Sequence, residues 1–353
     1  MLRWSAAGEE GLVRRIRRIF PRPSAEVSVP IGDDAACVRI PRAEDLVLTT
    51  DQMVEGIHFR RSTHPPELLG ARVLTVNLSD LASMGARPRW FLLSLFLPPD
   101  LPDPYLRGIL TGMASEARRR RAALVGGNLT ASPVLALDIS LTGSLDRGRR
   151  PLLRSGGRPG DLLFVTGSLG GSTLGLELLE EGWRWRRGRA VRRGGRRAEG
   201  PSATRALRRH LAPAPDYRLA QILSRHHLAS AAIDISDGLS LDLHRLCRSS
   251  GTGARIDARL LPLEPAALRL RGTDRALQMA LHGGEEYQLL FALPPGKLTA
   301  LRKMAGRSQV TRIGVLTRSP GRILLETGEK RTVRLEPGGF DHLGRSSRWP
   351  FAG

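Results

Sequence analysis

Four short acidic segments, each next to an apolar run, constrain this chain more than any other feature. They are Gly32-Asp33-Asp34, Thr49-Thr50-Asp51, Asn77-Leu78-Ser79-Asp80 and Asp234-Ile235-Ser236-Asp237-Gly238. A single aspartate of this kind is commonly a helix cap or a turn former. Burying an isolated charge is costly unless a partner neutralises it, so packing does not explain all four segments. Together they indicate a shared cation site.

The ligand types favour Mg²⁺. Hard oxygen donors without clustered Cys or His select Mg²⁺ over zinc, and Mg²⁺ held by few carboxylates usually also holds substrate phosphates. A metal-dependent phosphoryl-transfer enzyme is therefore expected. The chain has no Walker A lysine and no HRD or DFG tripeptide, which excludes P-loop NTPases and protein kinases by motif. Metal ions and an arginine such as Arg154 can supply the charge neutralisation.

A phosphate monoester acceptor would suit these residues. Its second pKa is about 6, so it is largely a dianion at pH 7 and can attack without a general base. That agrees with a chain that is rich in acidic turns and has no recurring His motif.

Length predicts two domains, because 353 residues exceed a comfortable single core. A stretch rich in Gly, Pro and Arg at 146–160 marks the expected boundary between an N-terminal domain at 1–147 and a C-terminal domain at 148–353. Met1–Ala7 lack an apolar segment, so we expect no signal peptide and a soluble protein. Cys37 and Cys247 form no CxxC motif, which fits the reducing cytoplasm.

The net charge of +21 raises the possibility of nucleic-acid binding. Only three of the 55 basic residues are lysines. Such a composition indicates a general replacement of Lys by Arg more than a dedicated nucleic-acid-binding patch. The charge concentrates in residues 183–197, which carry eight arginines and no acid. We expect a solvated, mobile insertion at about 183–204, and we expect neither a nucleic-acid nor a membrane partner.

Hydrophobic periodicity predicts alternating helices and strands. The expected helices are 12–20, 66–82 (with Asn77 and Asp80 on one face), 106–121, 173–181, 218–226, 239–249 and a helical stretch that ends at 281. The expected strands are 36–40 and 46–50, forming a hairpin-like unit, then 90–97, 135–145, 161–166, 231–235, 254–257 and 288–293.

A glycine-rich turn at 167–172 opens one of the expected helices. Backbone N–H groups at such a helix start can bind phosphate. The turn can equally be a tight strand-to-helix connection, and without a GxxxxGK[ST] match we favour the connection.

The ordered motifs resemble the thiamine-monophosphate kinase family. The motifs are the acidic segments above, extended by Val54-Glu55-Gly56-Ile57-His58-Phe59 and Leu81-Ala82-Ser83-Met84-Gly85-Ala86, then Leu153-Arg154-Ser155-Gly156, Gly283-Gly284-Glu285 and Gly339-Phe340-Asp341-His342. Each alone is weak, but their order over nearly the whole chain is specific.

The resemblance implies ATP- and Mg²⁺-dependent phosphorylation of thiamine monophosphate to thiamine diphosphate by direct in-line transfer. It also implies the fold of the aminoimidazole ribonucleotide synthetase superfamily, with two α/β domains. The N-terminal domain at 1–147 is then expected to bind Mg²⁺ and ATP and to form a homodimer through its sheet. The implied metal ligands are Asp34, Thr49, Thr50, Asp51, Asp80, Asn128, Asp234 and Asp237. The implied ATP contacts are Gly127, Asn128, Arg154 and Ser236, and the implied thiamine contacts are His58, Glu285 and Phe340.

Two departures from the family pattern stand out. Gly-Gly-Asp-Thr is replaced by Gly126-Gly127-Asn128-Leu129, so a neutral amide stands where the family has a metal-binding carboxylate. Gly-Gly-Glu-Asp-Tyr-Glu is replaced by 283–288 with Glu286 and Gln288. A weakened paralogue and another ATP-using member of the superfamily therefore remain alternatives. Selenophosphate synthetase and the hydrogenase-maturation dehydratase are disfavoured because neither terminus carries the Cys that they need.

Overall fold

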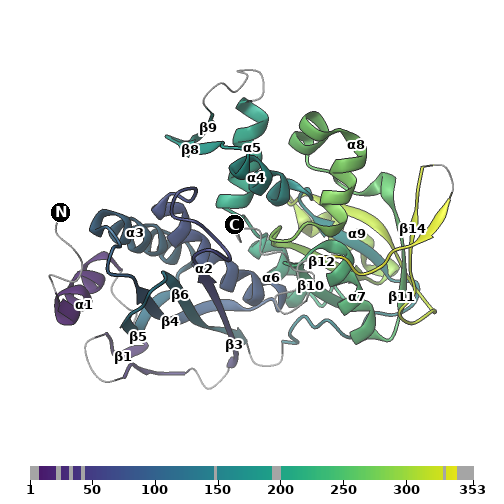
Figure 1. Cartoon of the computed structure of the whole chain (residues 1–353). Coiled ribbons are helices and arrows are strands. Elements are labelled where there is room, and N and C mark those ends of the chain that lie inside the picture. Colours follow the sequence, from purple (N-terminus) through teal and green to yellow (C-terminus); the bar gives the residue numbers. More distant parts are fainter. Residues whose placement is uncertain are drawn as a thin grey trace. The chain divides into compact units, whose positions relative to one another are not determined.

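The structure is a computed structural model that describes residues 8–20, 25–31, 35–40, 44–146, 149–192, 200–328 and 331–339. The chain divides into two compact units, shown in Figure 1. Unit 1 comprises Met1–Leu81, Ala86–Gly148 and Arg348–Gly353, and unit 2 comprises Ala82–Gly85 and Arg149–Ser347. No helix in the described residues is long and apolar enough to cross a membrane.

Unit 1 contains a four-stranded mixed sheet in the order β3-β6-β4-β5. Its elements are α1 (Gly8–Ile19), β1 (Val27–Val29), β2 (Cys37–Val38), β3 (Glu44–Val54), α2 (Pro66–Ser83), β4 (Arg87–Leu97), α3 (Asp103–Arg120), β5 (Ala123–Ala131) and β6 (Ala136–Asp146). α2 and α3 pack tightly, because a Cβ atom on Gly70 would lie 1.8 Å from the Ile109 carbonyl oxygen.

The two faces of this sheet differ. One face carries the buried side chains of Phe91, Leu93 and Ile139. On the other face Leu46, Leu48 and Leu92 are exposed, with Leu48 at 73%. A half-buried antiparallel sheet commonly alternates apolar and polar residues, so exposed leucines on one face are unusual.

Unit 2 contains a seven-stranded sheet in the order β10-β12-β7-β13-β11-β14-β15, plus a separate hairpin of β8 and β9. Its elements are β7 (Leu162–Thr166), α4 (Gly171–Glu180), β8 (Arg184–Arg186), β9 (Arg189–Val191), α5 (Gly200–Leu211), α6 (Tyr217–Arg225), β10 (Ala231–Ile235), α7 (Leu239–Ser250), β11 (Gly253–Asp257), α8 (Pro265–His282), β12 (Gln288–Leu293), α9 (Leu298–Ala305), β13 (Val310–Thr317), β14 (Ile323–Glu326) and β15 (Thr332–Arg334).

Helices cover both faces of the unit 2 sheet. Leu163 and Val165 of β7 pack in the core that contains α7 and the end of α8. Leu162 and Phe164 face the other core, which contains α6 and α9. Because both faces are buried, the central strands are continuously apolar instead of alternating. The predicted two-domain α/β fold is confirmed.

One expectation from the sequence is wrong. The strands predicted at 36–40 and 46–50 do not form a hairpin unit, because β2 pairs with β1 and β3 pairs with β6 along its whole length. Within the arginine-rich insertion expected at about 183–204, β8 and β9 form a hairpin whose residues are mostly exposed or partly exposed, and residues 193–199 lie outside the described residues. Arg187 and Gly188 both have positive φ at its turn, the geometry that two-residue hairpin turns favour. Trp183, just before β8, is buried.

Candidate functional site

In unit 1, the second and third acidic segments lie together. Thr49 of β3 donates from Oγ1 to Asp80 Oδ2 of α2 at 2.6 Å. Asn77, one turn earlier on α2, is fully buried and donates from Nδ2 to the backbone oxygens of Asp51 (3.3 Å) and Val73 (3.1 Å). The helix predicted at 66–82 therefore brings Asp80 to the strand that carries Asp51, and Asn77 joins the two elements.

Thr50 lies on the opposite face of the sheet, because successive side chains of a strand alternate. Its Oγ1 donates to the Ile139 carbonyl oxygen (3.0 Å) and to Asp138 Oδ1 (3.4 Å). Asp138 is a carboxylate that the sequence motifs did not single out. Within unit 1, the Thr50 hydroxyl is thus separated by the sheet from the Thr49–Asp80 pair.

Gly127 and Asn128 lie on β5. Gly127 has no room for a side chain, since a Cβ atom there would be 1.9 Å from the Leu93 carbonyl oxygen. Asn128 is paired in register with Ser94, which is itself paired with Asp138, so these three side chains share a face. The Asn128 amide is exposed and its Nδ2 lies 3.4 Å from Thr130 Oγ1.

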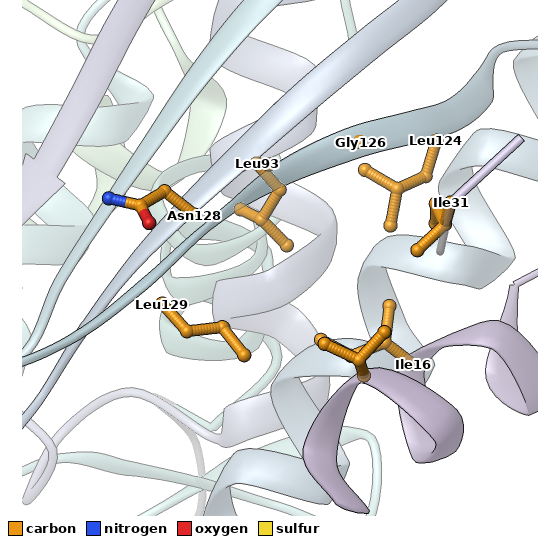
Figure 2. A pocket seen from close by; sticks show the side chains of 9 residues that line it. Ile16, Ile31, Leu93, Leu124, Gly126, Asn128 and Leu129 are labelled. Atoms are coloured by element: carbon orange, nitrogen blue, oxygen red, sulfur yellow. The ribbon is translucent and has the colours of Figure 1, made fainter. Parts of the chain in front are cut away.

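A small pocket adjoins this strand, between α1 and β5 (Figure 2). Its lining is mostly apolar and includes Ile16, Leu124 and Leu129. In Figure 2 the Asn128 amide points away from Ile16 and Leu129. Asn128 therefore borders the pocket through its backbone side and presents its polar group to the other face.

His58 follows β3 and closes a tight turn. Its Nδ1 accepts the backbone N–H of Val54 at 3.0 Å. A nitrogen that accepts a hydrogen bond carries no proton, so in the neutral ring the proton is on Nε2. Nε2 is therefore a hydrogen-bond donor.

In unit 2, Asp234 is a buried residue of β10, and Ser236 and Asp237 form the turn into α7. Asp242 organises this turn: it is fully buried, and its Oδ2 accepts the backbone N–H groups of Ser236 (3.2 Å) and Asp237 (3.1 Å). Arg245 Nη1 contacts Asp237 Oδ2 (2.5 Å) and Asp242 Oδ1 (2.7 Å).

Negative charge accumulates at this turn. Burial, followed by the charges of Asp234 and Asp237, raises the pKa of Asp242 to about 7, although Arg245 opposes the shift. The motif comparison missed Asp242 and Arg245. Their spacing from the acidic turn could have indicated them, since both lie on the first turns of the helix that follows it.

Arg154 is exposed in the segment before β7. The backbone N–H of Ala232 donates to the Leu153 carbonyl oxygen at 2.7 Å, so this segment runs alongside β10. Ser250 Oγ donates to the Arg154 carbonyl oxygen at 2.9 Å. The backbone at Arg154 is thus fixed while its side chain extends into solvent.

The glycine-rich turn before α4 is already occupied by a carboxylate. The backbone N–H groups of Gly170 and Ser172 both donate to Glu286 Oε1 at 2.9 Å. Arg209 of α5 contacts Glu286 Oε2 at 3.1 Å. Burial raises the pKa of Glu286, and these donors oppose the shift. Residues 167–172 are thus better explained as a tight strand-to-helix connection than as a phosphate-binding turn, because the N–H groups of Gly170 and Ser172 already donate to Glu286.

Glu285 lies next to this buried carboxylate, in the turn that leads into β12. Its side chain is 31% exposed, and its Oε2 lies 3.5 Å from His210 Nδ1. The sequence analysis predicted neither α5 nor a role for its residues Arg209 and His210.

The described residues contain no group of three or more His, Cys, Asp or Glu side chains arranged to hold a metal ion. Asp34 and Phe340, named by the motifs, lie outside the described residues. Thr49, Asp51 and Asp80 are gathered in unit 1, and Asp234, Ser236 and Asp237 in unit 2.

Comparison with known proteins identifies the family. Residues 32–145 match the AIR synthase related protein, N-terminal domain, and residues 158–325 match its C-terminal domain. Thiamine-monophosphate kinase of Escherichia coli K12 is 36% identical over 341 residues, which cover 96% of this chain and 99% of the relative.

Solved structures agree. The crystal structure of thiamine-monophosphate kinase from Stenotrophomonas maltophilia K279a has a TM-score of 0.77 at 32% identity, covering 91% of this chain and 96% of that one. AaThiL complexed with AMPPCP and TMP has a TM-score of 0.72 at 32% identity, covering 97% of this chain and 99% of that one. With both domains matched and relatives aligned over nearly their whole length, the chain belongs to the thiamine-monophosphate kinase family of AIR synthase related proteins.

Proposed function

We propose that this protein transfers the γ-phosphoryl group of ATP to thiamine monophosphate, forming thiamine diphosphate and ADP. The observation that carries the proposal is the Asp80 carboxylate, which Thr49 holds at 2.6 Å beside Asp51. Such a group suits a phosphate–cation site, and phosphoryl transfer depends mainly on positioning and electrostatics. Family membership and the AaThiL complex with AMPPCP and TMP support the same reaction.

Several Mg²⁺ ions are part of this proposal. Their ligands would be drawn from the hard oxygens predicted above, which are Asp34, Thr49, Thr50, Asp51, Asp80 and Asn128 in unit 1 and Asp234 and Asp237 in unit 2. The donor chemistry fits, because carboxylate, hydroxyl and amide oxygens are what Mg²⁺ prefers. The charges of Asp234 and Asp237, which add to the effect of burial in raising the pKa of Asp242, also fit a site that receives a cation. When bound, Mg²⁺ would neutralise phosphate charge.

The remaining predicted contacts divide by chemistry. Gly127 is proposed to contact ATP through its backbone, and Arg154 and Ser236 offer donors to ATP. His58 Nε2–H can donate to the substrate, and the half-exposed Glu285 can accept from the amino group of thiamine or pair with its cationic ring. Phe340, outside the described residues, is proposed to pack against thiamine.

The test measures both products. Purified protein with Mg²⁺, ATP and thiamine monophosphate is expected to form thiamine diphosphate and ADP in equal amounts, quantified by chromatography. Thiamine and aminoimidazole ribonucleotide precursors serve as alternative substrates, because the latter would reveal a different superfamily activity. ADP release without thiamine diphosphate would reject the proposal.

We also propose a homodimer formed through the unit 1 sheet. The exposed Leu46, Leu48 and Leu92 on one face support it, since contiguous exposed apolar side chains commonly mark an interface. Replacing Leu48 with Glu is expected to halve the mass seen by light scattering, whereas an unchanged mass would reject this interface. A cytoplasmic location is likewise proposed, supported by the free thiols of Cys37 and Cys247.

A further inference from the structure

The turn that carries Glu285 is held in an unusual backbone conformation. Glu285 and Tyr287 have φ values of +61° and +52°, in the left-handed region that residues other than glycine rarely adopt. The turn is tied to the end of β10, because Glu285 N–H donates to Ser236 O at 2.6 Å and Tyr287 N–H donates to Ile235 O at 2.8 Å. Such conformations persist only where the surroundings fix them, and they gather at functional sites.

Helix α5 supplies part of that fixation. His210, its penultimate residue, is 1% exposed. Its Nδ1 lies 3.1 Å from Ser172 Oγ and 3.5 Å from Glu285 Oε2. Ser172 links the two neighbouring glutamates, since its backbone N–H donates to Glu286 while its hydroxyl contacts His210.

The position of His210 is tightly set by helix packing. α4 and α5 approach closely at Gly175, where a Cβ atom would lie 2.4 Å from Ala206 O and 2.6 Å from His210 Cβ. Figure 1 shows α4 and α5 adjacent in unit 2. With no side chain at Gly175, the two helices pack closely, and α5 has little freedom to move away from the turn.

The contact leaves Glu285 available to a ligand. Its side chain has one oxygen near a buried imidazole, while 31% of its surface stays exposed. A carboxylate held in this way has fewer orientations to lose when it binds a donor or a cation, and preorganisation of this kind raises affinity.

We propose that His210 is a positioning residue, which acts through Glu285 to orient the carboxylate toward the thiamine part of the substrate. This inference rests on the proposed function, in which Glu285 contacts thiamine monophosphate. It assigns a role in substrate binding to α5, a helix that follows the arginine-rich segment and that no sequence motif marks.

The first experiment compares His210→Leu with His210→Asn. Leu removes the polar contact, whereas the Asn side-chain amide can replace Nδ1 as a donor at similar reach. His210→Leu is expected to raise KM for thiamine monophosphate about tenfold, because it removes the hydrogen bond to Ser172 and the 3.5 Å contact with the Glu285 carboxylate. KM for ATP should change less than about twofold, and His210→Asn should restore most of the affinity.

Calorimetric titration of the nucleotide-free protein with thiamine monophosphate gives a second measure, independent of turnover. Thr252→Val is the control for stability, because Thr252 is also buried in unit 2 but belongs to the segment before β11. It is expected to leave both KM values unchanged. Equal increases of both KM values in His210→Leu would show a merely structural role and overturn the inference.

A double-mutant cycle with Glu285→Gln tests separately whether Glu285 contacts the substrate and whether His210 acts through Glu285. If His210 acts through Glu285, the double variant should bind thiamine monophosphate no more weakly than Glu285→Gln alone. Additive losses, or a normal affinity in His210→Leu beside a weakened Glu285→Gln, would refute the inference and leave the proposed function standing. Normal affinity in Glu285→Gln itself would reject Glu285 as a substrate contact, and the inference with it.

Discussion

The buried carboxylate of Glu286 provides the sharpest test of how unit 2 is held together. It accepts two backbone N–H groups from the start of α4 and pairs with Arg209 of α5, so it joins three segments distant in sequence. Glu286→Gln keeps the size and leaves one oxygen to accept both N–H groups. It replaces the oxygen that faces Arg209 with an amide N–H₂, which cannot accept a hydrogen bond.

The magnitude follows from what the variant leaves unpaired. Removing one partner of a buried ion pair costs about 3–5 kcal/mol. Arg209 is 19% exposed and keeps its bond to the Ser168 carbonyl oxygen at 2.6 Å, so part of its charge remains solvated and hydrogen-bonded. We therefore expect Glu286→Gln to lower the free energy of unfolding by about 2–3 kcal/mol.

Urea unfolding measures this loss, with an unchanged m-value as evidence that the unfolded state is the same. The matched control is Glu326→Gln, which breaks an ion pair with Arg255. The side chain of Glu326 is 36% exposed and that of Arg255 is 55% exposed. Exposed pairs contribute about 0–1 kcal/mol. If Glu286→Gln costs no more than this control, the buried carboxylate does not anchor the turn and the reasoning fails.

Three further predictions concern unit 1 and the thiols. Asp51→Asn and Asp80→Asn should each abolish turnover but change the unfolding free energy by less than about 1 kcal/mol, because these carboxylates contribute charge and little packing. Near-normal rates at saturating Mg²⁺ would show that the two carboxylates have a structural role only. Asn128→Asp should lower the Mg²⁺ concentration for half-maximal activity about five- to thirty-fold, or about 1–2 kcal/mol, since it adds a charged oxygen ligand; an equal or higher requirement would refute a weakened ligand. In the native protein a thiol reagent should label exposed Cys37 but not Cys247, whose pKa burial raises to about 11, and labelling of both at once would contradict the packing.

Local patterns were sufficient for much of the fold. The helix over 66–83 and the apolar strands β7, β10 and β12 were predictable, because their periodicity and apolar runs are properties of neighbouring residues. The pairing of β3 was not predictable in the same way. It pairs with β6, about ninety residues away, and nothing in the local sequence distinguishes that partner from the nearby β2.

Composition did not reveal the hairpin in the arginine-rich segment. The arginines at 184–192 suggested a solvated loop, yet exposed charges are compatible with a short hairpin whose turn residues have positive φ. The hairpin is also anchored to α5, because Ala190 N–H donates to Thr204 Oγ1 at 3.0 Å. Ala190 is buried beside that helix, and such a contact lies beyond the range of a local pattern.

By itself the sequence determined the family and the reaction class, because the order of the motifs is a property of the chain. It predicted the residue types of the site from the aspartates on turns. Only the tertiary structure decided which of these groups meet. It placed Thr49 against Asp80, separated Thr50 from them by alternation along β3, and brought His210 to Glu285. The physical reason is that strand pairing and helix packing join residues far apart in sequence, and such contacts have no local pattern to reveal them.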